Sequence, residues 1–146
     1  MGTVNDLLSQ KQGRPLLSAR PDETVLAVTQ RMNEHGIGAM LVMEGNRMVG
    51  IFTERDVLRR VVAEERLPSA VLVSDVMTSK VACCTPETSI EEASSLMRQY
   101  RIRHIPVVNS QGDVLGVISI GDLNAYHAKN QQVEIHFLQE YLHGRV

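Results

Sequence analysis

Apolar positions at helical spacing occur in two stretches of this chain. In the first, Val25, Val28 and Met32 fall on one face of a helix, just after a Pro-acid-Thr cluster that is typical of a helix start. The same pattern returns from Ile90 to Met97, after a second Pro-acid-Thr cluster. Each stretch predicts an amphipathic helix of about three turns with one buried stripe.

Strand-like apolar runs follow both predicted helices. They begin at Ile37 and Ile102, so they are separated by the same interval as Val25 and Ile90, and each leads to a turn sequence, at Gly45 and Asn109, that suits a hairpin. The second turn is longer by a single position, and the features beyond it are shifted by that amount. The chain is therefore predicted to contain an internal repeat.

The second strand of each predicted hairpin runs into a duplicated motif, "GIFTERD" and "GVISIGD". Both copies read Gly, two apolar residues, a hydroxyl residue, two further residues and Asp. The hydroxyl and acid pairs are Thr53–Asp56 and Ser119–Asp122, and a helix is predicted to begin at each Asp. An Asp here is a good cap or first-turn residue, so a structural role is one interpretation. A repeated carboxylate that binds a ligand is the other.

The whole chain follows this duplication. The similar segments "VNDLLS", from Val4, and "VSDVMT", from Val73, each precede a half that reads strand, helix, strand, strand, helix. A unit of about 60 residues buries little apolar surface alone, so two copies are expected to share one interior. We predict an α/β protein with a first repeat and its lead-in at residues 1–66, a second repeat at 67–129 and a C-terminal amphipathic helix at 130–146.

Composition narrows the function classes. Hydrophobic residues at 43% and charged residues at 22% are typical of a soluble globular protein, and an aromatic content of 3% requires an aliphatic core. A net charge of -2 without a Lys/Arg block argues against a nucleic-acid binder. No apolar stretch near the N-terminus suits a signal or a membrane anchor, which favours a cytoplasmic protein without membrane contact. Cys83 and Cys84 are adjacent, which disfavours a disulfide between them and suggests reduced core residues.

Catalytic and metal chemistry are not indicated. The sequence offers no clear activated nucleophile or acid–base pair, and its Gly-containing turns are not phosphate loops. His136 and His143 share a helical face without carboxylate or Cys partners, which argues against a metal site. The sequence therefore predicts that the protein is not an enzyme. The apolar stripe of residues 130–146 either packs on its own repeat or forms a dimer contact.

The duplicated motif, the segment "RHIPVV" at 103–108 and the β-α-β-β-α order together resemble a pair of CBS domains, also called a Bateman module. The resemblance spans about residues 4–129 and is closest to small stand-alone bacterial proteins of this family. It implies two β-α-β-β-α repeats packed sheet to sheet with pseudo-twofold symmetry.

The resemblance also implies a regulatory function. Such pairs bind adenine nucleotides, with AMP expected first and ADP, ATP or NAD(H) also possible, and they act as energy or redox sensors in signal transduction. A homodimer and an unknown target protein are the implied partners. The alternative is a dimerisation or docking module whose nucleotide clefts are vestigial.

The family pattern implies two clefts, each combining the Asp segment of one repeat with strands of the other. In both, the Asp accepts hydrogen bonds from the ribose hydroxyls and the Thr or Ser reaches the phosphate or ribose. Arg55 either pairs with phosphate or is a solvated surface residue. The first cleft would be basic and suit AMP; its residues are Thr53, Arg55, Asp56, Lys80, Val81, Ala82, Ile102, Arg103, His104 and Pro106. The second would be less charged and would stay empty, hold adenosine or take part of a dinucleotide; its residues are Ser119, Asp122, Ser18, Ile37, Gly38 and Ala39.

Overall fold

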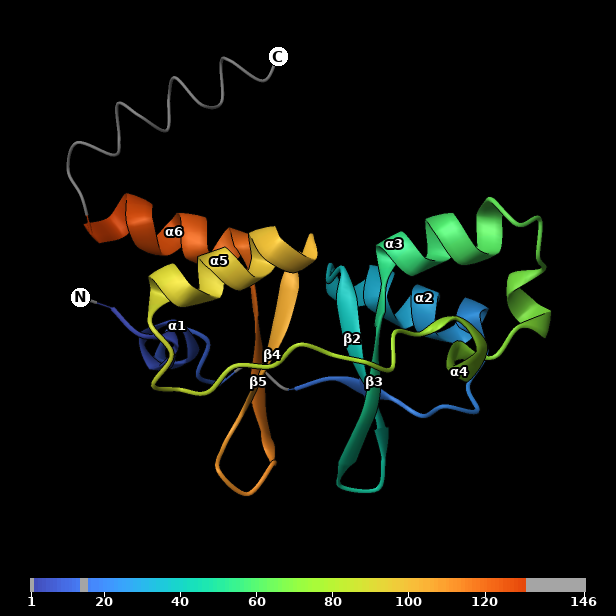
Figure 1. Ribbon diagram of the computed structural model, residues 1–146. Coiled ribbons are helices and arrows are strands. Elements are labelled where there is room, and N and C mark those ends of the chain that lie inside the picture. The colour runs from blue at the N-terminus through green and yellow to red at the C-terminus, as the bar shows by residue number, and fades with distance from the viewer. Residues whose placement is uncertain (1, 14–15, 131–146) are drawn as a thin grey trace, which may run out of the picture. The chain divides into compact units, whose positions relative to one another are not determined.

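The computed structural model describes residues 2–13 and 16–130, so the predicted C-terminal helix and its two histidines lie outside the described residues. Figure 1 shows the helices and strands, coloured in their order along the chain. The helices are α1 (Val4–Ser9), α2 (Val25–His35), α3 (Glu54–Asp56), the π-helical η1 (Val57–Val62), the 3₁₀ turn η2 (Pro68–Ala70), α4 (Val73–Val76), α5 (Ile90–Tyr100) and α6 (Ile120–Asn130). The strands are β1 (Ser18–Ala19), β2 (Ala39–Glu44), β3 (Arg47–Thr53), β4 (His104–Val108) and β5 (Val114–Ser119).

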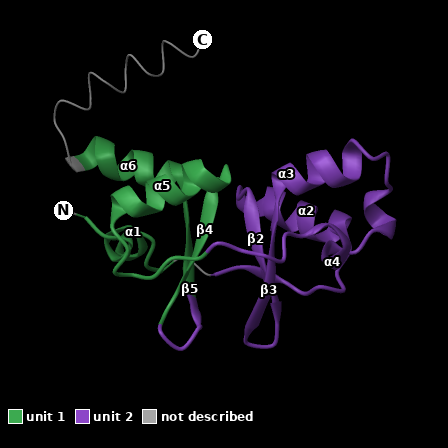
Figure 2. Cartoon of the chain, viewed as in Figure 1, with its two compact units in different colours: residues 1–13, 83–109, 115–146 green, residues 14–82, 110–114 purple. Residues whose placement is uncertain are grey.

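The chain divides into two compact units, coloured in Figure 2. Among the described residues, unit 1 contains 2–13, 83–109 and 115–130, and unit 2 contains 16–82 and 110–114. Each unit has its own cluster of buried apolar side chains. Phe52 and Val28 are fully buried in unit 2, and Ile105 and Ile118 are fully buried in unit 1. Phe52 is the only aromatic residue among the largest fully buried side chains of the described residues; the others are Leu, Ile, Val and Met, in agreement with the core expected from the composition.

The sheet of unit 2 has the strand order β1-β2-β3. β1 is parallel to β2, with Ala19 opposite Val42, and β2 is antiparallel to β3. The predicted hairpin turn is confirmed: Gly45 has φ +65°, a conformation that glycine adopts without steric penalty. The strand predicted from Ile37 begins two residues later, at Ala39.

Unit 1 repeats this arrangement with a hairpin of β4 and β5 and a turn at Gly112, φ +84°. The strand predicted before α5 is reduced to one parallel bridge between Cys84 and Val107, which corresponds to the Ala19–Val42 pair of the first repeat. β4 begins at His104, two residues after the predicted start. The repeat predicted from sequence is thus present down to individual strand partners.

The two long amphipathic helices begin where their sequences predict. Thr24 caps α2, its Oγ1 accepting from the Ala27 N–H at 3.1 Å, and Ser89 caps α5, its Oγ accepting from the Glu92 N–H at 3.1 Å. Each cap satisfies a backbone donor that the first turn leaves unpaired.

The lead-in segments pack against the repeat that they do not precede. The Val4 N–H of the first lead-in donates to Thr88 O at 2.8 Å, beside the start of α5. The Val73 N–H of the second lead-in donates to Glu23 O at 2.9 Å, two residues before the start of α2. Unit 1 therefore contains the first lead-in and most of the second repeat, while unit 2 contains most of the first repeat and the second lead-in. The boundary proposed between residues 66 and 67 separates the repeats in sequence, but the compact units cross it.

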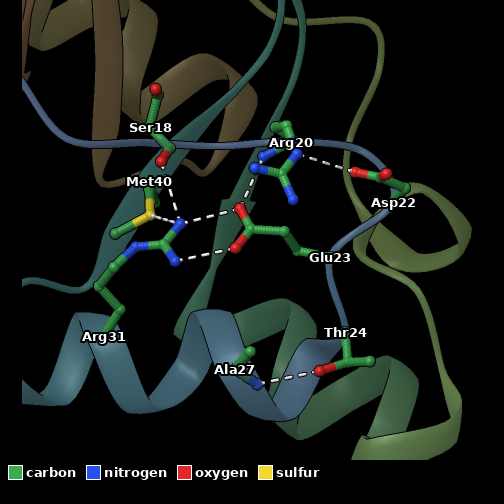
Figure 3. A network of polar contacts seen from close by, with 8 residues as sticks. All are labelled: Ser18, Arg20, Asp22, Glu23, Thr24, Ala27, Arg31 and Met40. Carbon is green, nitrogen blue, oxygen red and sulfur yellow. Dashed lines mark hydrogen bonds and ion pairs between the residues drawn. The ribbon is translucent and has the colours of Figure 1, made fainter.

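An ion-pair network links Arg31 of α2 to the segment that precedes this helix, from Ser18 to Glu23 (Figure 3). Arg31 donates from Nη1 to Glu23 Oε1 and from Nη2 to Oε2, both at 2.9 Å, and also from Nη2 to Ser18 O at 3.0 Å. These bonds from Arg31 lower the pKa of the Glu23 carboxyl to about 2. Thr88 and Leu96 occupy the corresponding positions of the second repeat, which therefore does not carry this pair.

We expect Glu23→Gln to lower the free energy of unfolding by about 1–2 kcal/mol at neutral pH, because it breaks a bidentate, partly screened charge pair. Since the folded-state pKa lies below that of the unfolded chain, this stabilisation is present above about pH 4.5 and is lost as pH falls towards about 2. Thermal unfolding of both proteins from pH 7 to pH 3 should show the difference shrink. Asp22→Asn is the control, because the Arg20–Asp22 pair is about three-quarters exposed, and it should change little. An equal difference at all pH values would contradict this account.

Candidate functional site

The first copy of the duplicated motif forms a reciprocal cap at the end of β3. Thr53 precedes α3 and has an extended backbone, with φ −124° and ψ 162°. Its N–H donates to Asp56 Oδ2 at 2.9 Å, and the Asp56 N–H donates to Thr53 Oγ1 at 3.3 Å. The helix therefore begins at Glu54, and the predicted start at Asp56 is wrong by two residues. The hydroxyl residue is the cap, and the acid occupies the third helical position.

The second copy has the same geometry at the junction of β5 and α6. The Ser119 N–H donates to Asp122 Oδ2 at 2.8 Å, and the Asp122 N–H donates to Ser119 Oγ at 3.1 Å. Here too the helix begins two residues before the predicted start, at Ile120. Both acids are thus held in a fixed orientation by backbone geometry.

The environment of Asp56 is unfavourable for a charge. Its exposed fraction is 7%, and among the described residues it is the only charged residue that is buried. Burial raises the pKa of this carboxyl, although the Thr53 N–H and the charge of Arg60 act in the opposite direction. Oδ1 lies 3.8 Å from Arg60 Nε, whose guanidinium also donates to Val76 O at 3.0 Å. Asp56 Oδ1 can therefore accept additional hydrogen bonds.

Asp122 is neutralised directly by Lys11, a residue of the first lead-in. Lys11 Nζ lies 2.9 Å from Asp122 Oδ2 and donates to Val117 O at 2.7 Å. Both side chains are less than one-third exposed. Lys11 is not among the residues predicted from the sequence. A signal for it is present, because the lead-ins "VNDLLSQK" and "VSDVMTSK" align Lys11 with the predicted residue Lys80.

The predicted β2 and β4 binding segments lie beside the motif of their own unit. The Glu54 N–H donates to Gly38 O at 3.0 Å, and the Ile120 N–H donates to Arg103 O at 3.0 Å. A Cβ placed on Gly38 would meet Glu54 Oε1 at 3.1 Å, so the Glu54 carboxylate lies close over this glycine. The corresponding corner of unit 1 has the exposed Arg103 instead. Gly38 and Ala39 stand where the second repeat has Arg103 and His104, and the Glu54 carboxylate adds a negative charge beside them, so the charge difference between the repeats is larger than the loss of two basic residues.

The other predicted residues fall into both units. Lys80 is exposed and lies two residues after Thr78. Thr78 exchanges backbone hydrogen bonds with Ile51 of β3, at 2.9 and 3.0 Å. Unit 2 contains ten predicted residues: Ser18, Ile37, Gly38, Ala39, Thr53, Arg55, Asp56, Lys80, Val81 and Ala82. Unit 1 contains six: Ile102, Arg103, His104, Pro106, Ser119 and Asp122. Each predicted cleft uses residues of both units, so its assembly stays a prediction.

Several of these side chains differ in exposure. Pro106 is buried, and its carbonyl accepts from the Cys84 N–H at 3.0 Å. His104 and Ile102 are partly buried, whereas Ser18 is exposed. Their roles in binding stay predictions.

Other chemistry finds little support in the described residues. Neither cysteine forms a disulfide, and burial with the neighbouring Cys83 raises the pKa of Cys84 to about 11, which disfavours a thiolate nucleophile. Within residues 2–13 and 16–130, His, Cys, Asp and Glu form no group of three or more that could hold a metal ion. No helix in these ranges has the length and apolar character that a membrane span requires.

Comparison with known proteins agrees with the duplicated geometry. The model of the CBS domain family matches residues 4–63 and again 73–129. A CBS domain-containing mitochondrial protein of Arabidopsis thaliana, CBSX3, is 34% identical over 151 residues, covering 97% of this chain and 72% of that protein.

Solved structures have the same fold. A protein with CBS domains from Burkholderia ambifaria superimposes with a TM-score of 0.83 at 39% identity, covering 88% of this chain and 96% of the other. The CBS domain protein PAE2072 of Pyrobaculum aerophilum, solved in complex with AMP, has a TM-score of 0.72 at 26% identity, covering 82% of this chain and 88% of that one. CBS domain pairs are regulatory modules that bind adenosine nucleotides. The family model matches both repeats of this chain, and each repeat has the same acid in its helix cap, so this chain belongs to the CBS domain family.

Proposed function

We propose that this chain is a regulatory module that binds an adenine nucleotide at each copy of the duplicated motif, with AMP as the foremost ligand. ADP, ATP and NAD(H) share the adenosine group and are the further candidates. The proposal is supported by the family match and by the AMP complex of the relative from Pyrobaculum aerophilum.

The observation that carries the proposal is the state of Asp56. A buried carboxylate with a raised pKa is stabilised by each hydrogen-bond donor that reaches it. A ribose diol offers two neighbouring hydroxyl donors, and an ionised carboxylate accepts both. The cap holds Asp56 rigidly, so little orientation entropy is lost on binding.

In this proposal the nucleotide acts as an energy or redox signal that the protein passes to a separate partner protein. We also propose that the protein forms a homodimer and lies in the cytoplasm. The first rests on the family resemblance and the second on the sequence pattern. A non-catalytic role follows from the regulatory character of the family.

The alternative is a docking or dimerisation module with vestigial clefts. One observation favours it: the capping boxes already give Asp56 and Asp122 a structural role. This alternative predicts that no nucleotide binds at either motif.

Calorimetric titration of the ligand-free protein with AMP, ATP and NADH separates the two. We expect saturable binding of at least one of these ligands and a melting temperature that rises with its concentration, because a ligand that binds only the folded state stabilises it by mass action. The absence of binding by all three at millimolar concentration would favour the docking module.

A further inference from the structure

We infer that Lys11 is the anion-recognition residue of the Asp122 site and makes this site selective for a phosphorylated nucleoside over an uncharged one. This inference rests on the proposed function and deepens it. It also revises the expectation that the second cleft is the less charged one, because Lys11 adds a cation that is not among the residues predicted for that cleft.

The placement of Lys11 is specific. Its ammonium contacts two oxygens within the Asp122 motif of unit 1, Val117 O at 2.7 Å and Asp122 Oδ2 at 2.9 Å. An ammonium has three N–H donors, so one remains after these two bonds. Asp122 Oδ2 also accepts from the Ser119 N–H, while Oδ1 has no hydrogen bond to a described residue. A ribose hydroxyl can therefore bind at Oδ1 while Lys11 keeps its place.

The remaining N–H of Lys11 explains the selectivity. The Lys11 side chain is 29% exposed and that of Asp122 is 22%, so each compensates the partial desolvation of the other. Hydrogen bonds from the ribose hydroxyls to Asp122 Oδ1 leave this ion pair in place. A nucleoside without phosphate offers the remaining N–H of Lys11 no anionic acceptor. A 5′-phosphate carried by the same ribose offers one and gains a charge-assisted hydrogen bond.

The two motifs differ in this respect. The acid of the first motif has Arg60 Nε at 3.8 Å, beyond hydrogen-bond distance, whereas the acid of the second has a Lys in direct contact. The Arg60 guanidinium is committed to Val76 O and Met77 O, which limits its freedom to follow a phosphate. Phosphate recognition by a basic residue that contacts the acid directly is therefore expected at the Asp122 motif and not at the Asp56 motif.

The test uses the full chain with Asp56→Asn, so that the remaining binding reports on the Asp122 site. AMP and adenosine are titrated into this protein and into versions that also carry Lys11→Met, Lys11→Arg or Lys129→Met. We expect Lys11→Met to lower the affinity for AMP about tenfold while the affinity for adenosine is unchanged or higher, because one charge-assisted hydrogen bond is lost. Lys11→Arg keeps the charge and should retain most of the preference. Lys129 is exposed in the same unit, and its substitution should leave both affinities unchanged.

The outcomes are distinguishable. If AMP binds but Lys11→Met lowers both affinities equally, or neither, the inference is wrong and the proposed function stands. If the wild-type chain binds AMP but the Asp56→Asn protein does not, the inference is also wrong. If the wild-type chain binds none of AMP, ATP and NADH, both the inference and the proposed function are wrong. Thermal unfolding of each variant shows that it is folded, and the Lys11→Arg protein provides the comparison if Lys11→Met unfolds.

Discussion

Asp56→Asn is expected to lower the affinity of one of two AMP sites by roughly tenfold to a hundredfold. The substitution removes the negative charge that receives the ribose hydroxyls, and hydrogen bonds to charged groups contribute more than neutral ones. The side chain keeps its size, and an Asn Oδ1 still accepts from the Thr53 N–H, so the start of α3 should be preserved. The free energy of unfolding is expected to change little, because the lost charge was buried at an energetic cost.

Calorimetry with AMP measures this effect as the loss of one binding event from the stoichiometry. Asp75→Asn is a matched control, because Asp75 occupies the same capping position in α4, with the Leu72 N–H 3.4 Å from its Oδ2, but lacks the preceding hydroxyl residue. It should leave both sites intact. If Asp56→Asn and Asp75→Asn behave alike in the AMP titration, Asp56 is a structural cap and does not bind the ribose.

Gly50→Ala is expected to lower the free energy of unfolding by about 2–3 kcal/mol, whereas the equivalent Gly116→Ala should lower it by less than about 1 kcal/mol. A Cβ on Gly50 would lie 2.6 Å from Met77 Sδ and 2.8 Å from the backbone oxygen of Thr78. That oxygen accepts from the Ile51 N–H, so relief of the clash disturbs the bridge between β3 and the second lead-in. A Cβ on Gly116 would meet only the Leu8 Cδ2 methyl group, at 2.8 Å, and a side-chain end can move.

Chemical denaturation of the two variants measures the difference, and the melting temperature of Gly50→Ala should fall by roughly 4–12 °C. Because the glycines occupy the same position in the two repeats, each is the control for the other. Equal losses would show that the lead-in packs as rigidly on β5 as on β3.

Much of the fold could be predicted from local pattern alone. The helices α2 and α5 begin where the Thr24 and Ser89 caps predict, because capping depends on residues within one turn. The hairpin turns that contain Gly45 and Gly112 are also predictable, because a turn depends on a few adjacent residues. The motif pairs were found by repetition, which needs no knowledge of packing.

The predicted helix starts are wrong, even though the interactions that set them are local. The prediction places the first helical residue at Asp56 and at Asp122, but the hydroxyl residue three positions earlier caps each helix. The pattern hydroxyl-x-x-Asp is itself a capping-box signature, with Asp in place of the usual Glu or Gln. The sequence therefore contains the information that sets each helix start.

The sequence by itself determined the duplication, the order of elements within each repeat, and the two capped acids, because each is written in residues close together along the chain. Only the tertiary structure decided which repeat each lead-in joins, since the Val4–Thr88 hydrogen bond links distant residues and leaves no trace in hydrophobic periodicity. The same exchange decided the charge beside Asp122. It brings Lys11 to Asp122 across 111 positions, a contact that depends on packing and not on spacing.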